Sequence, residues 1–302
     1  MTSGLIFDIK RYAINDGPGI RLTFFFKGCP LSCVWCHNPE SKSPNIQKMY
    51  SAKKCIETTD CISVCPNDAL TLTPDGIVTD PAVCQLCGKC AEACPTKAIE
   101  MSGKLVTVEE IARIIESETV FFDHSEGGVT FSGGEPLMHA DFLIDLLKDC
   151  GQKDIHRVVD TSGFAPTETL MEVAKHTDMF LYDLKVMDSK IHKQYTGVSN
   201  EMILKNLEIL ANSGTEIIIR IPLVKGFNTD IDNIQKTADF IAGLSGKKKK
   251  TNLLPYHNIA ETKYVKMGIF SKAKGLSEPS TEEIAQIQQI FGNRGLVATV
   301  GG

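Results

Sequence analysis

The chain has 302 residues, of which 42% are hydrophobic, and a formal net charge of -5 at pH 7. This length allows a large buried core, built either as one α/β domain or as a domain that carries an insert. The acidic balance gives no reason to expect nucleic acid or an anionic membrane as a partner, and we expect neither.

The amino terminus has no basic region that leads into an apolar run of signal-peptide length. No window approaches 18 uninterrupted apolar residues, the length of a membrane-spanning helix. We therefore expect a cytoplasmic protein. The chain has 11 cysteines, and in a reducing compartment these indicate metal ligands rather than disulfides.

A short loop after the predicted strand at residues 20–27 carries Cys29, Cys33 and Cys36 with the spacing Cys-x3-Cys-x2-Cys. Thiolates favour zinc or iron-sulfur clusters, and three of them leave one corner of a four-iron cluster open. A zinc loop that uses His37 or a distant residue as its fourth ligand also fits the ligand count. The loop stands at the carboxyl end of a strand, where ligands bind in parallel α/β folds.

The composition changes over residues 48–103, which contain seven cysteines and little helical periodicity. One run of four cysteines matches the bacterial ferredoxin spacing Cys-x2-Cys-x2-Cys-x3-Cys-Pro completely. A second run matches it with one omission, because Thr58 stands where the second cysteine is expected. The complete run is Cys84, Cys87, Cys90 and Cys94, and the interrupted run is Cys55, Cys61 and Cys65.

In ferredoxins the fourth cysteine of each run binds the cluster of the other run. This rule predicts one site with four cysteines and one site with three. The three-cysteine site would hold a three-iron cluster or take a non-cysteine ligand such as Asp60. A lobe stapled by zinc is the alternative for the whole segment. The predicted sites are Cys65, Cys84, Cys87 and Cys90 for the first, and Cys55, Cys61 and Cys94 for the second.

The remaining chain alternates regularly between predicted strands and helices, as parallel sheets with crossover helices do. A capping box, Thr107 followed by Glu110, marks the first helix after the cysteine-rich segment. We expect residues 259–279 to form a loop. The predicted strands are residues 4–9, 20–27, 128–132, 156–160, 178–183, 215–222 and 251–255, with an edge strand at 296–300. The predicted helices are residues 107–118, 139–149, 166–176, segments within 188–213, 230–243 and 281–291.

Short motifs follow one another along nearly the whole chain, most of them at predicted strand ends. They are AspGlyProGlyIleArg at residues 16–21, HisAsnProGlu at 37–40, SerGlyGlyGluPro at 132–136, AspThrSerGly at 160–163, AspLeuLys at 183–185, ThrGly at 196–197 and LeuProTyrHis at 254–257. Together with the cysteine loop, this series resembles the radical S-adenosylmethionine (SAM) superfamily and, within it, the activating enzymes of glycyl radical enzymes.

The resemblance implies an α/β fold, a partial (β/α)6 barrel of the radical SAM type with an inserted ferredoxin-like iron-sulfur domain. Six of the predicted strands, counted from the strand at 20–27, fit such a barrel. We expect residues 1–47 and 104–302 to form the barrel and residues 48–103 to form the insert.

The resemblance also implies how the site is built. A [4Fe-4S] cluster on Cys29, Cys33 and Cys36 would bind SAM at its open iron, and Na+ or K+ would be held by Asp160, Thr161 and Asp183. From the residues alone, paired glycines mark a tight turn, acids at strand ends cap turns, and a lone histidine is a surface residue. The residues implied to bind SAM are Trp35, Cys36, His37, Gly133, Gly134, Glu135, Asp183, Leu184, Lys185 and His257.

The implied reaction is reductive cleavage of SAM, after which the 5'-deoxyadenosyl radical abstracts hydrogen from a glycine of a partner glycyl radical enzyme. One or two auxiliary clusters would sit in the insert, a flavodoxin or ferredoxin would be the reductant, and the chain would be a monomer. The loop at residues 16–21 would face the substrate. The insert disfavours a pyruvate formate-lyase activase and suggests partners that act on diols, choline, aromatic acids or sulfonates.

Two other functions are consistent with parts of the pattern. A radical SAM enzyme that modifies a small molecule or another peptide would use the same cysteine loop. A non-catalytic electron-transfer protein would need only the ferredoxin-like cysteines, and the SAM-binding motifs argue against it.

Overall fold

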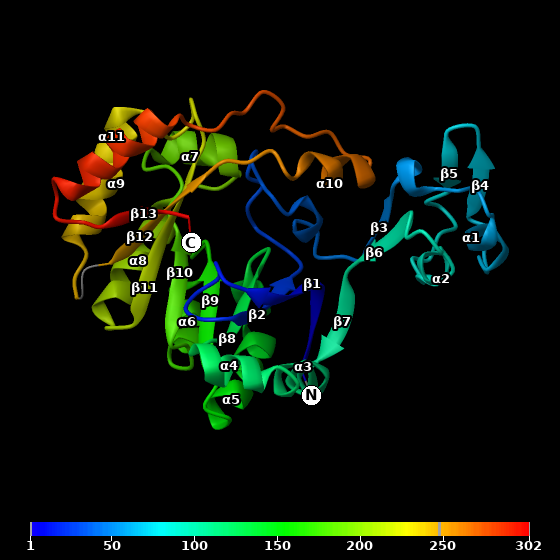
Figure 1. The fold of residues 1–302 in the computed structure, drawn as a ribbon, viewed down its shortest axis with the longest axis horizontal. Helices are drawn as coiled ribbons and strands as arrows, with labels where there is room; N and C mark the ends of the chain where they lie inside the picture. The colour runs from blue at the N-terminus through cyan, green and yellow to red at the C-terminus, as the bar shows by residue number, and fades with distance from the viewer. Residues whose placement is uncertain (1, 247–248, 302) are drawn as a thin grey trace.

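The computed structural model describes residues 2–246 and 249–301. Within these residues, nine strands form one sheet in the order β13-β12-β11-β10-β9-β8-β2-β1-β7 (Figure 1). The seven strands from β13 to β2 in this order are parallel to one another. Strand β1 is antiparallel to both β2 and β7. The bounds are β1 Ser3–Ala13, β2 Arg21–Phe26, β7 Lys104–Thr107, β8 Gly128–Gly133, β9 His156–Thr161, β10 Met179–Asp183, β11 Glu216–Leu223, β12 Lys250–Pro255 and β13 Ala298–Val300.

The six predicted barrel strands and the predicted edge strand all form, each within one or two residues of its expected range. The sequence analysis misses β7, which consists of four residues paired with the start of β1. The predicted helix at 107–118 forms as α3 (Val108–Glu116), but the short helix that follows it, α4 (Thr119–Ser125), was not predicted. The predicted loop at 259–279 is wrong in part, because it contains the short helix α10.

Helices cover the outer face of the sheet and bury their apolar side chains against it. Two of them begin with a capping box, at Thr107 with Glu110 and at Ser280 with Glu283. The first confirms the predicted helix start, because Glu110 N–H donates to Thr107 Oγ1 at 3.3 Å. The helices are α3 Val108–Glu116, α4 Thr119–Ser125, α5 Ala140–Gln152, α6 Thr167–Ala174, α7 Ser189–Thr196, α8 Glu201–Asn212, α9 Ile231–Gly243, α10 Glu261–Lys266 and α11 Thr281–Gly292, with 3-10 turns at Pro39–Ser41, Ala52–Lys54 and Pro136–His139.

The concave side of the sheet is apolar at one end and polar at the other. Val158, Met179 and Leu181 form a small buried cluster near the amino ends of their strands. The loop at residues 16–21 lies against this end, where Thr23 Oγ1 donates to Asp16 Oδ2 at 2.8 Å. Buried Arg21 donates to the carbonyl of Pro18 at 2.9 Å. Its guanidinium therefore holds the loop rather than reaching outward.

The cysteine-rich insert has its own small core and projects to one side of the barrel (Figure 1). An antiparallel ribbon of two strands, β3 and β6, joins it to the barrel. Gln47 at the start of β3 accepts a hydrogen bond from Lys27 Nζ at 2.9 Å, which anchors the ribbon to the end of the barrel strand β2. The insert contains β3 Gln47–Tyr50, α1 Asp60–Ser63, β4 Leu70–Thr73, β5 Gly76–Thr79, α2 Lys89–Glu92 and β6 Ile99–Ser102.

In the described part of the chain, no helix has the length and apolar character needed to cross a membrane.

Candidate active site

A cavity of about 260 Å³ opens at the carboxyl ends of the parallel strands. The cysteine loop after β2 forms one side, and the ends of β8 to β12 form the rest. Its lining is Cys29, Leu31, Cys33, Trp35, Cys36, His37, Asn38, Ser41, Ser132, Gly133, Gly134, Asp160, Thr161, Ser162, Asp183, Lys185, Arg220, Pro222, Val224, Leu254, Pro255 and Tyr256. Most of the motif residues predicted to bind SAM therefore meet in one place.

The cysteine loop is fixed by the carboxyl end of α7. Ser32 N–H donates to the carbonyl of Thr196 at 2.7 Å, and Val34 N–H donates to the carbonyl of Tyr195 at 3.0 Å. Gly197 follows with a φ of +85°, and a Cβ there would lie 2.4 Å from the hydroxyl of Ser32. The ThrGly motif is thus a docking point for the loop. Its left-handed backbone conformation favours glycine at position 197, and a Cβ there would make the Ser32 hydroxyl rotate away.

The thiols of the loop are held in a largely buried setting. Burial raises the pKa of Cys29 to about 12 and the pKa of Cys33 to about 11, although the nearby Lys185 ammonium acts to lower the latter. Burial raises the pKa of Cys36 as well. Three soft ligands at one cavity fit an iron-sulfur cluster, and binding of iron would displace their protons.

The SerGlyGlyGluPro loop packs directly on the strand that leads to the cysteines. A Cβ on Gly133 would lie 2.2 Å from Phe26 N, and a Cβ on Gly134 would lie 2.1 Å from Gly28 O. The glycines line the cavity and also allow this backbone contact, which the sequence did not indicate. The loop is therefore a wall of the cavity that packs against the start of the cysteine loop.

Glu135 is fully buried and does not belong to the lining of the cavity. Its carboxylate accepts hydrogen bonds from Thr161 Oγ1 at 2.6 Å, from Ser162 N–H at 2.9 Å and from Leu137 N–H at 3.2 Å. These bonds tie the loop after β8 to the loop after β9. The structure thus gives Glu135 an internal role, and direct contact with SAM through its side chain stays a prediction.

Two ion pairs lie at the polar end of the barrel interior. Lys185 Nζ is 2.6 Å from Asp183 Oδ2, and Arg220 Nη1 is 3.2 Å from Asp160 Oδ2. Ser132 Oγ also donates to Asp160 Oδ2 at 2.7 Å. Burial raises the pKa of Asp160 to about 6, with Arg220 acting in the opposite direction.

Sequence reasoning missed Arg220, although a cation inside the strand GluIleIleIleArgIleProLeu was a usable signal. Because Asp160 and Asp183 already face cationic side chains, the Na+ or K+ site at Asp160, Thr161 and Asp183 stays a prediction. Among residues 2–246 and 249–301, no three His, Cys, Asp or Glu side chains meet closely enough to hold a single metal ion.

Aromatic and apolar side chains form the outer part of the cavity. Trp35 is only 6% exposed, and its ring centroid is 6.3 Å from that of Phe227. His37 lies 5.7 Å from Tyr256 between ring centroids, and burial lowers its pKa. The lowered pKa favours the neutral imidazole, and the rings of Trp35, His37 and Tyr256 give the cavity flat surfaces that suit the packing of a flat heterocycle.

Two further predicted SAM contacts, in addition to Glu135, are not part of the lining. Leu184 is buried in the main core of the barrel. The side chain of His257 is 56% exposed, and its Nδ1 lies 3.6 Å from Glu278. Tyr256, one residue earlier, lines the cavity instead. The roles of Leu184 and His257 as SAM contacts stay predictions that this geometry does not support.

Helix α10 connects the cysteine loop with the insert. Lys263 Nζ is 2.6 Å from Glu40 just after the loop, and Lys266 Nζ is 2.7 Å from Glu100 on β6. Between them, the hydroxyl of Tyr264 donates to the carbonyl of Cys36 at 3.4 Å. A helix that the sequence did not predict therefore fixes one wall of the site.

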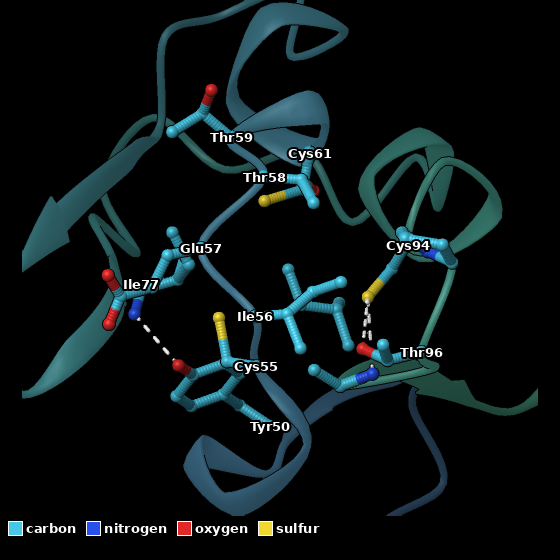
Figure 2. A pocket seen from close by; sticks show the side chains of 13 residues that line it. Tyr50, Cys55, Ile56, Glu57, Thr58, Thr59, Cys61, Ile77, Cys94 and Thr96 are labelled. Carbon is cyan, nitrogen blue, oxygen red and sulfur yellow. Dashed lines mark hydrogen bonds between the residues drawn. The ribbon is translucent and has the colours of Figure 1, made fainter.

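The insert cysteines line two separate cavities. We call the first the three-cysteine cavity, and Figure 2 shows its three sulfur atoms facing a common space. We call the second the four-cysteine cavity. The three-cysteine cavity contains Cys55, Cys61 and Cys94, and the four-cysteine cavity contains Cys65, Cys84, Cys87 and Cys90, which is the grouping that the ferredoxin rule predicts.

The suggested fourth ligand of the three-cysteine cavity is not where it was expected. Asp60 is exposed and does not line the cavity, whereas Thr58 and Tyr50 do (Figure 2). Backbone amides approach one of the thiols, because Ala98 N–H donates to Cys94 Sγ at 3.1 Å. Although burial acts to raise the pKa of Cys94, these hydrogen bonds lower it. This is a setting for a bound thiolate.

Comparison with known families separates the alternatives. The profile of the Radical SAM superfamily matches residues 87–241, and that of a 4Fe-4S dicluster domain matches residues 54–98. The second match favours iron-sulfur clusters over a zinc-stapled lobe in the insert. The first match begins after the cysteine loop. The assignment of a cluster to this loop is therefore supported by its own geometry and by the relatives that match along almost the whole chain.

Two relatives match along almost the entire chain. The trans-4-hydroxy-L-proline dehydratase activating enzyme of Clostridioides difficile is 40% identical over 99% of this chain and 99% of its own length. The (2S)-3-sulfopropanediol dehydratase activating enzyme of Klebsiella oxytoca is 38% identical over 99% of this chain and 97% of its own length. Among solved structures, a domain of a pyruvate-formate lyase-activating enzyme from Bacteroides vulgatus ATCC 8482 has a TM-score of 0.51 and 45% identity, over 58% of this chain and 99% of that chain.

These matches agree with a site in which three thiols, a paired lysine and a glycine loop surround one cavity. The chain therefore belongs to the radical SAM family of glycyl radical enzyme activating enzymes, in the group that carries a ferredoxin-like iron-sulfur insert.

Proposed function

We propose that the protein activates a glycyl radical enzyme by cleaving SAM reductively at a [4Fe-4S] cluster held by Cys29, Cys33 and Cys36. When bound, the cluster supplies the electron that splits SAM into methionine and the 5'-deoxyadenosyl radical, which takes hydrogen from a glycine Cα of the partner. The observation that carries this proposal is the convergence of the three cysteines with Lys185 and the Gly133 backbone on one cavity.

The residues of the chain bind and orient SAM rather than move protons. Lys185 is in position to meet the carboxylate of SAM, and Asp183 keeps the lysine charged and directed into the cavity. Trp35 and Tyr256 offer apolar surfaces for the adenosine. Glu135 holds the glycine wall from behind through Thr161. The reaction needs no catalytic acid or base, because its chemistry comes from the cofactor.

The insert serves electron transfer in this proposal. Its seven cysteines hold one or two auxiliary clusters, and a flavodoxin or ferredoxin delivers electrons to them. We assign residues 48–103 to this insert and residues 1–47 and 104–302 to the barrel. We also propose that the chain acts as a monomer in the cytoplasm and that Na+ or K+ supplements the charges at Asp160, Thr161 and Asp183.

The partner is a glycyl radical enzyme, and the relatives indicate which kinds to test first. Two of them are named as activating enzymes of dehydratases, one for trans-4-hydroxy-L-proline and one for a sulfonated diol. The sulfonated diol falls within the substrate types that the insert suggests, whereas hydroxyproline lies outside them. We propose a partner that acts on a small hydroxylated compound.

The test uses reduced, anaerobic holoenzyme with SAM and a candidate partner. Formation of 5'-deoxyadenosine after addition of dithionite, together with a glycyl radical signal in electron paramagnetic resonance (EPR), is expected. The matched control is the same partner with its radical glycine replaced by alanine, which should give no radical signal. SAM cleavage without a radical on any glycyl radical enzyme, but with modification of a small molecule, would favour the alternative radical SAM function.

A further inference from the structure

Strand β3 places one polar side chain in each cavity of the insert. Lys48 and Tyr50 are two positions apart on this strand and therefore point to the same face of the ribbon. Lys48 lines the four-cysteine cavity, and Tyr50 lines the three-cysteine cavity. The same strand thus contributes a cation to one site and a neutral phenol to the other.

The polar atoms of Tyr50 and Lys48 differ in whether they have a hydrogen-bond partner. The hydroxyl of Tyr50 accepts a hydrogen bond from Ile77 N–H at 3.0 Å (Figure 2). In the described part of the chain, Lys48 Nζ is buried and has no hydrogen-bond partner. A buried ammonium without a partner is strongly unfavourable, because it loses hydration and gains nothing in return.

The surroundings of Lys48 indicate which group would offset the charge of its buried ammonium. Lys48 lines the same cavity as Cys65, Cys84, Cys87 and Cys90. Burial lowers its pKa, and the thiolates of Cys90, Cys84, Cys65 and Cys61 act in the opposite direction. Four thiolates around a four-iron core give the bound cluster a net negative charge, which becomes more negative on reduction. A neighbouring cation stabilises the reduced form more than the oxidised form.

We propose that Lys48 is the counter-charge of the iron-sulfur cluster in the four-cysteine cavity and raises the reduction potential of that cluster. The proposal rests on the assignment of Cys65, Cys84, Cys87 and Cys90 as its ligands. In the step concerned, the external reductant loses one electron and the cluster gains it. No bond forms or breaks, and Lys48 keeps its proton throughout.

The position of the four-cysteine cavity in the molecule indicates what the charge of Lys48 does for electron transfer. Gln47, next to Lys48, is bonded to Lys27 at the barrel. Figure 1 places α2, which carries Cys90, between the barrel and α1, which carries Cys61. On the ribbon, the pair Lys48 and Met101 of the four-cysteine cavity is next to Gln47 and Ser102 at the barrel, whereas the pair Tyr50 and Ile99 of the three-cysteine cavity is farther along. A raised potential there holds the electron at the cluster on the barrel side of the insert rather than at the other auxiliary cluster.

The test is a redox titration monitored by EPR on full-length protein in which Cys29, Cys33 and Cys36 are alanine, so that only the auxiliary clusters contribute. Lys48→Met removes the charge and keeps the length of the side chain. At the applied potential that half-reduces the parent cluster, we expect about a tenfold lower ratio of reduced to oxidised cluster in the variant, which corresponds to about 59 mV for one electron. Lys48→Gln should behave in the same way, and Lys48→Arg should stay near the parent.

Lys89→Met is the matched control, because Lys89 lines the same cavity but is exposed to solvent. Water screens its charge, so we expect a much smaller change. An equal shift in Lys89→Met, or no shift in either neutral Lys48 variant, would overturn the proposal. Iron analysis tests the ligand assignment separately from the effect of Lys48 on the reduction potential. Loss of iron on replacing Cys87 by alanine supports the ligand assignment, whereas its retention would refute that assignment independently of any potential.

Discussion

Lys185 is the one lysine in the described lining of the SAM cavity, and its charge depends on Asp183. Burial acts to lower its pKa, but the carboxylate of Asp183 together with the Cys33 and Cys29 thiolates raises the pKa above the ordinary value. The ammonium therefore stays charged inside the cavity, where we propose that it meets the carboxylate of SAM. A single cation within a low-dielectric wall contributes more to binding than the same cation at the surface.

Replacing Lys185 by methionine should weaken SAM binding by about tenfold or more, equivalent to about 1.4 kcal/mol, without changing the iron content. His257→Ala should have a smaller effect, because its side chain is more than half exposed and faces Glu278. Equilibrium titration with SAM measures both. Equal losses of affinity would show that the loop of His257 closes over the bound cofactor.

Each of Cys29, Cys33 and Cys36 should be indispensable for SAM cleavage. Alanine at any of these positions removes one corner of the cluster with the open iron, while the insert lies outside the barrel core and should still load its clusters. The measurement is 5'-deoxyadenosine formed per enzyme, together with iron content. Normal product formation by any single variant would refute the assignment of that cysteine.

Thr58 stands in the three-cysteine cavity at the position of the missing thiolate. Thr58→Cys should complete the site, since a fourth thiolate holds the iron corner that otherwise exchanges. In the protein without the SAM-cluster cysteines, iron should rise from about seven to about eight per chain, counting four per complete cluster. Asp60→Cys is the control, because Asp60 lies outside the cavity, and it should leave the iron count unchanged.

A count of about four irons in the protein without the SAM-cluster cysteines would carry a different meaning. It would show that Cys55, Cys61 and Cys94 hold no cluster in the natural sequence. A rise on introducing Thr58→Cys would then measure the creation of a site rather than the completion of one.

Helix α7 supports the cysteine loop, and its stability has a pH dependence that can be tested. His192 is buried, and one of its ring nitrogens lies 2.7 Å from the carbonyl of Val198. Burial lowers the pKa of His192 below the value of an unfolded chain. The neutral form is thus preferred in the folded state, so its contribution to stability is present above the unfolded pKa, near 6.5, and is lost as the pH falls.

His192→Gln should therefore lose less stability than the parent protein when the pH is lowered from about 7 to about 5, across the unfolded histidine pKa. Apparent melting temperatures of anaerobic holoenzyme at several pH values provide the measurement. His124→Gln, a change at an exposed position, serves as the control and should follow the parent curve. A His192→Gln curve parallel to the parent would mean that this imidazole does not titrate differently on folding.

Elements with a strong local signal were predicted well from the sequence. Apolar runs at the parallel strands and the capping box at Thr107 required no tertiary information. The elements that were missed owe their existence to distant contacts. β7 forms by pairing with β1, and the six-residue α10 is held by the ion pairs of Lys263 and Lys266.

In the site, too, features with a local sequence signal were predicted and features that depend on distant contacts were not. Strand ends predicted which side chains meet, because the carboxyl ends of parallel strands share one edge. The pairing partners could not be read from the chain, since Arg220 and Lys48 depend on side-chain direction across different elements. Glu135 and His257 belong to motifs that are predicted to contact SAM, but neither residue lines the cavity. A motif gives the position of a residue in the chain but not whether its side chain turns into the protein or away from it.

At the scale of the whole molecule, the barrel and the insert have separate cores. Gln47 and Ser102 are paired neighbours on β3 and β6, so the insert leaves and rejoins the barrel at one point. Replacing residues 48–101 by a short turn should therefore preserve the barrel. We expect such a protein to hold about four irons and to cleave SAM with dithionite.

With a flavodoxin or ferredoxin as the electron donor, the shortened protein should be much slower than the full chain, because the auxiliary clusters are gone. Comparison of the two reductants on both proteins measures this directly. Equal rates with the protein reductant would show that electrons reach the SAM cluster without passing through the insert.

Helix α10 has a consequence for the order of events during synthesis. Lys263 bonds to Asn38, 225 positions earlier in the chain. The insert cysteines, by contrast, all emerge within residues 55–94. Because chains fold from the amino end as they leave the ribosome, the insert can receive iron while the later strands are still being made. The pocket of the SAM cluster gains its last wall only after α10 has been made. Nascent chains halted near residue 250 should therefore carry auxiliary iron and fail to retain iron at Cys29, Cys33 and Cys36.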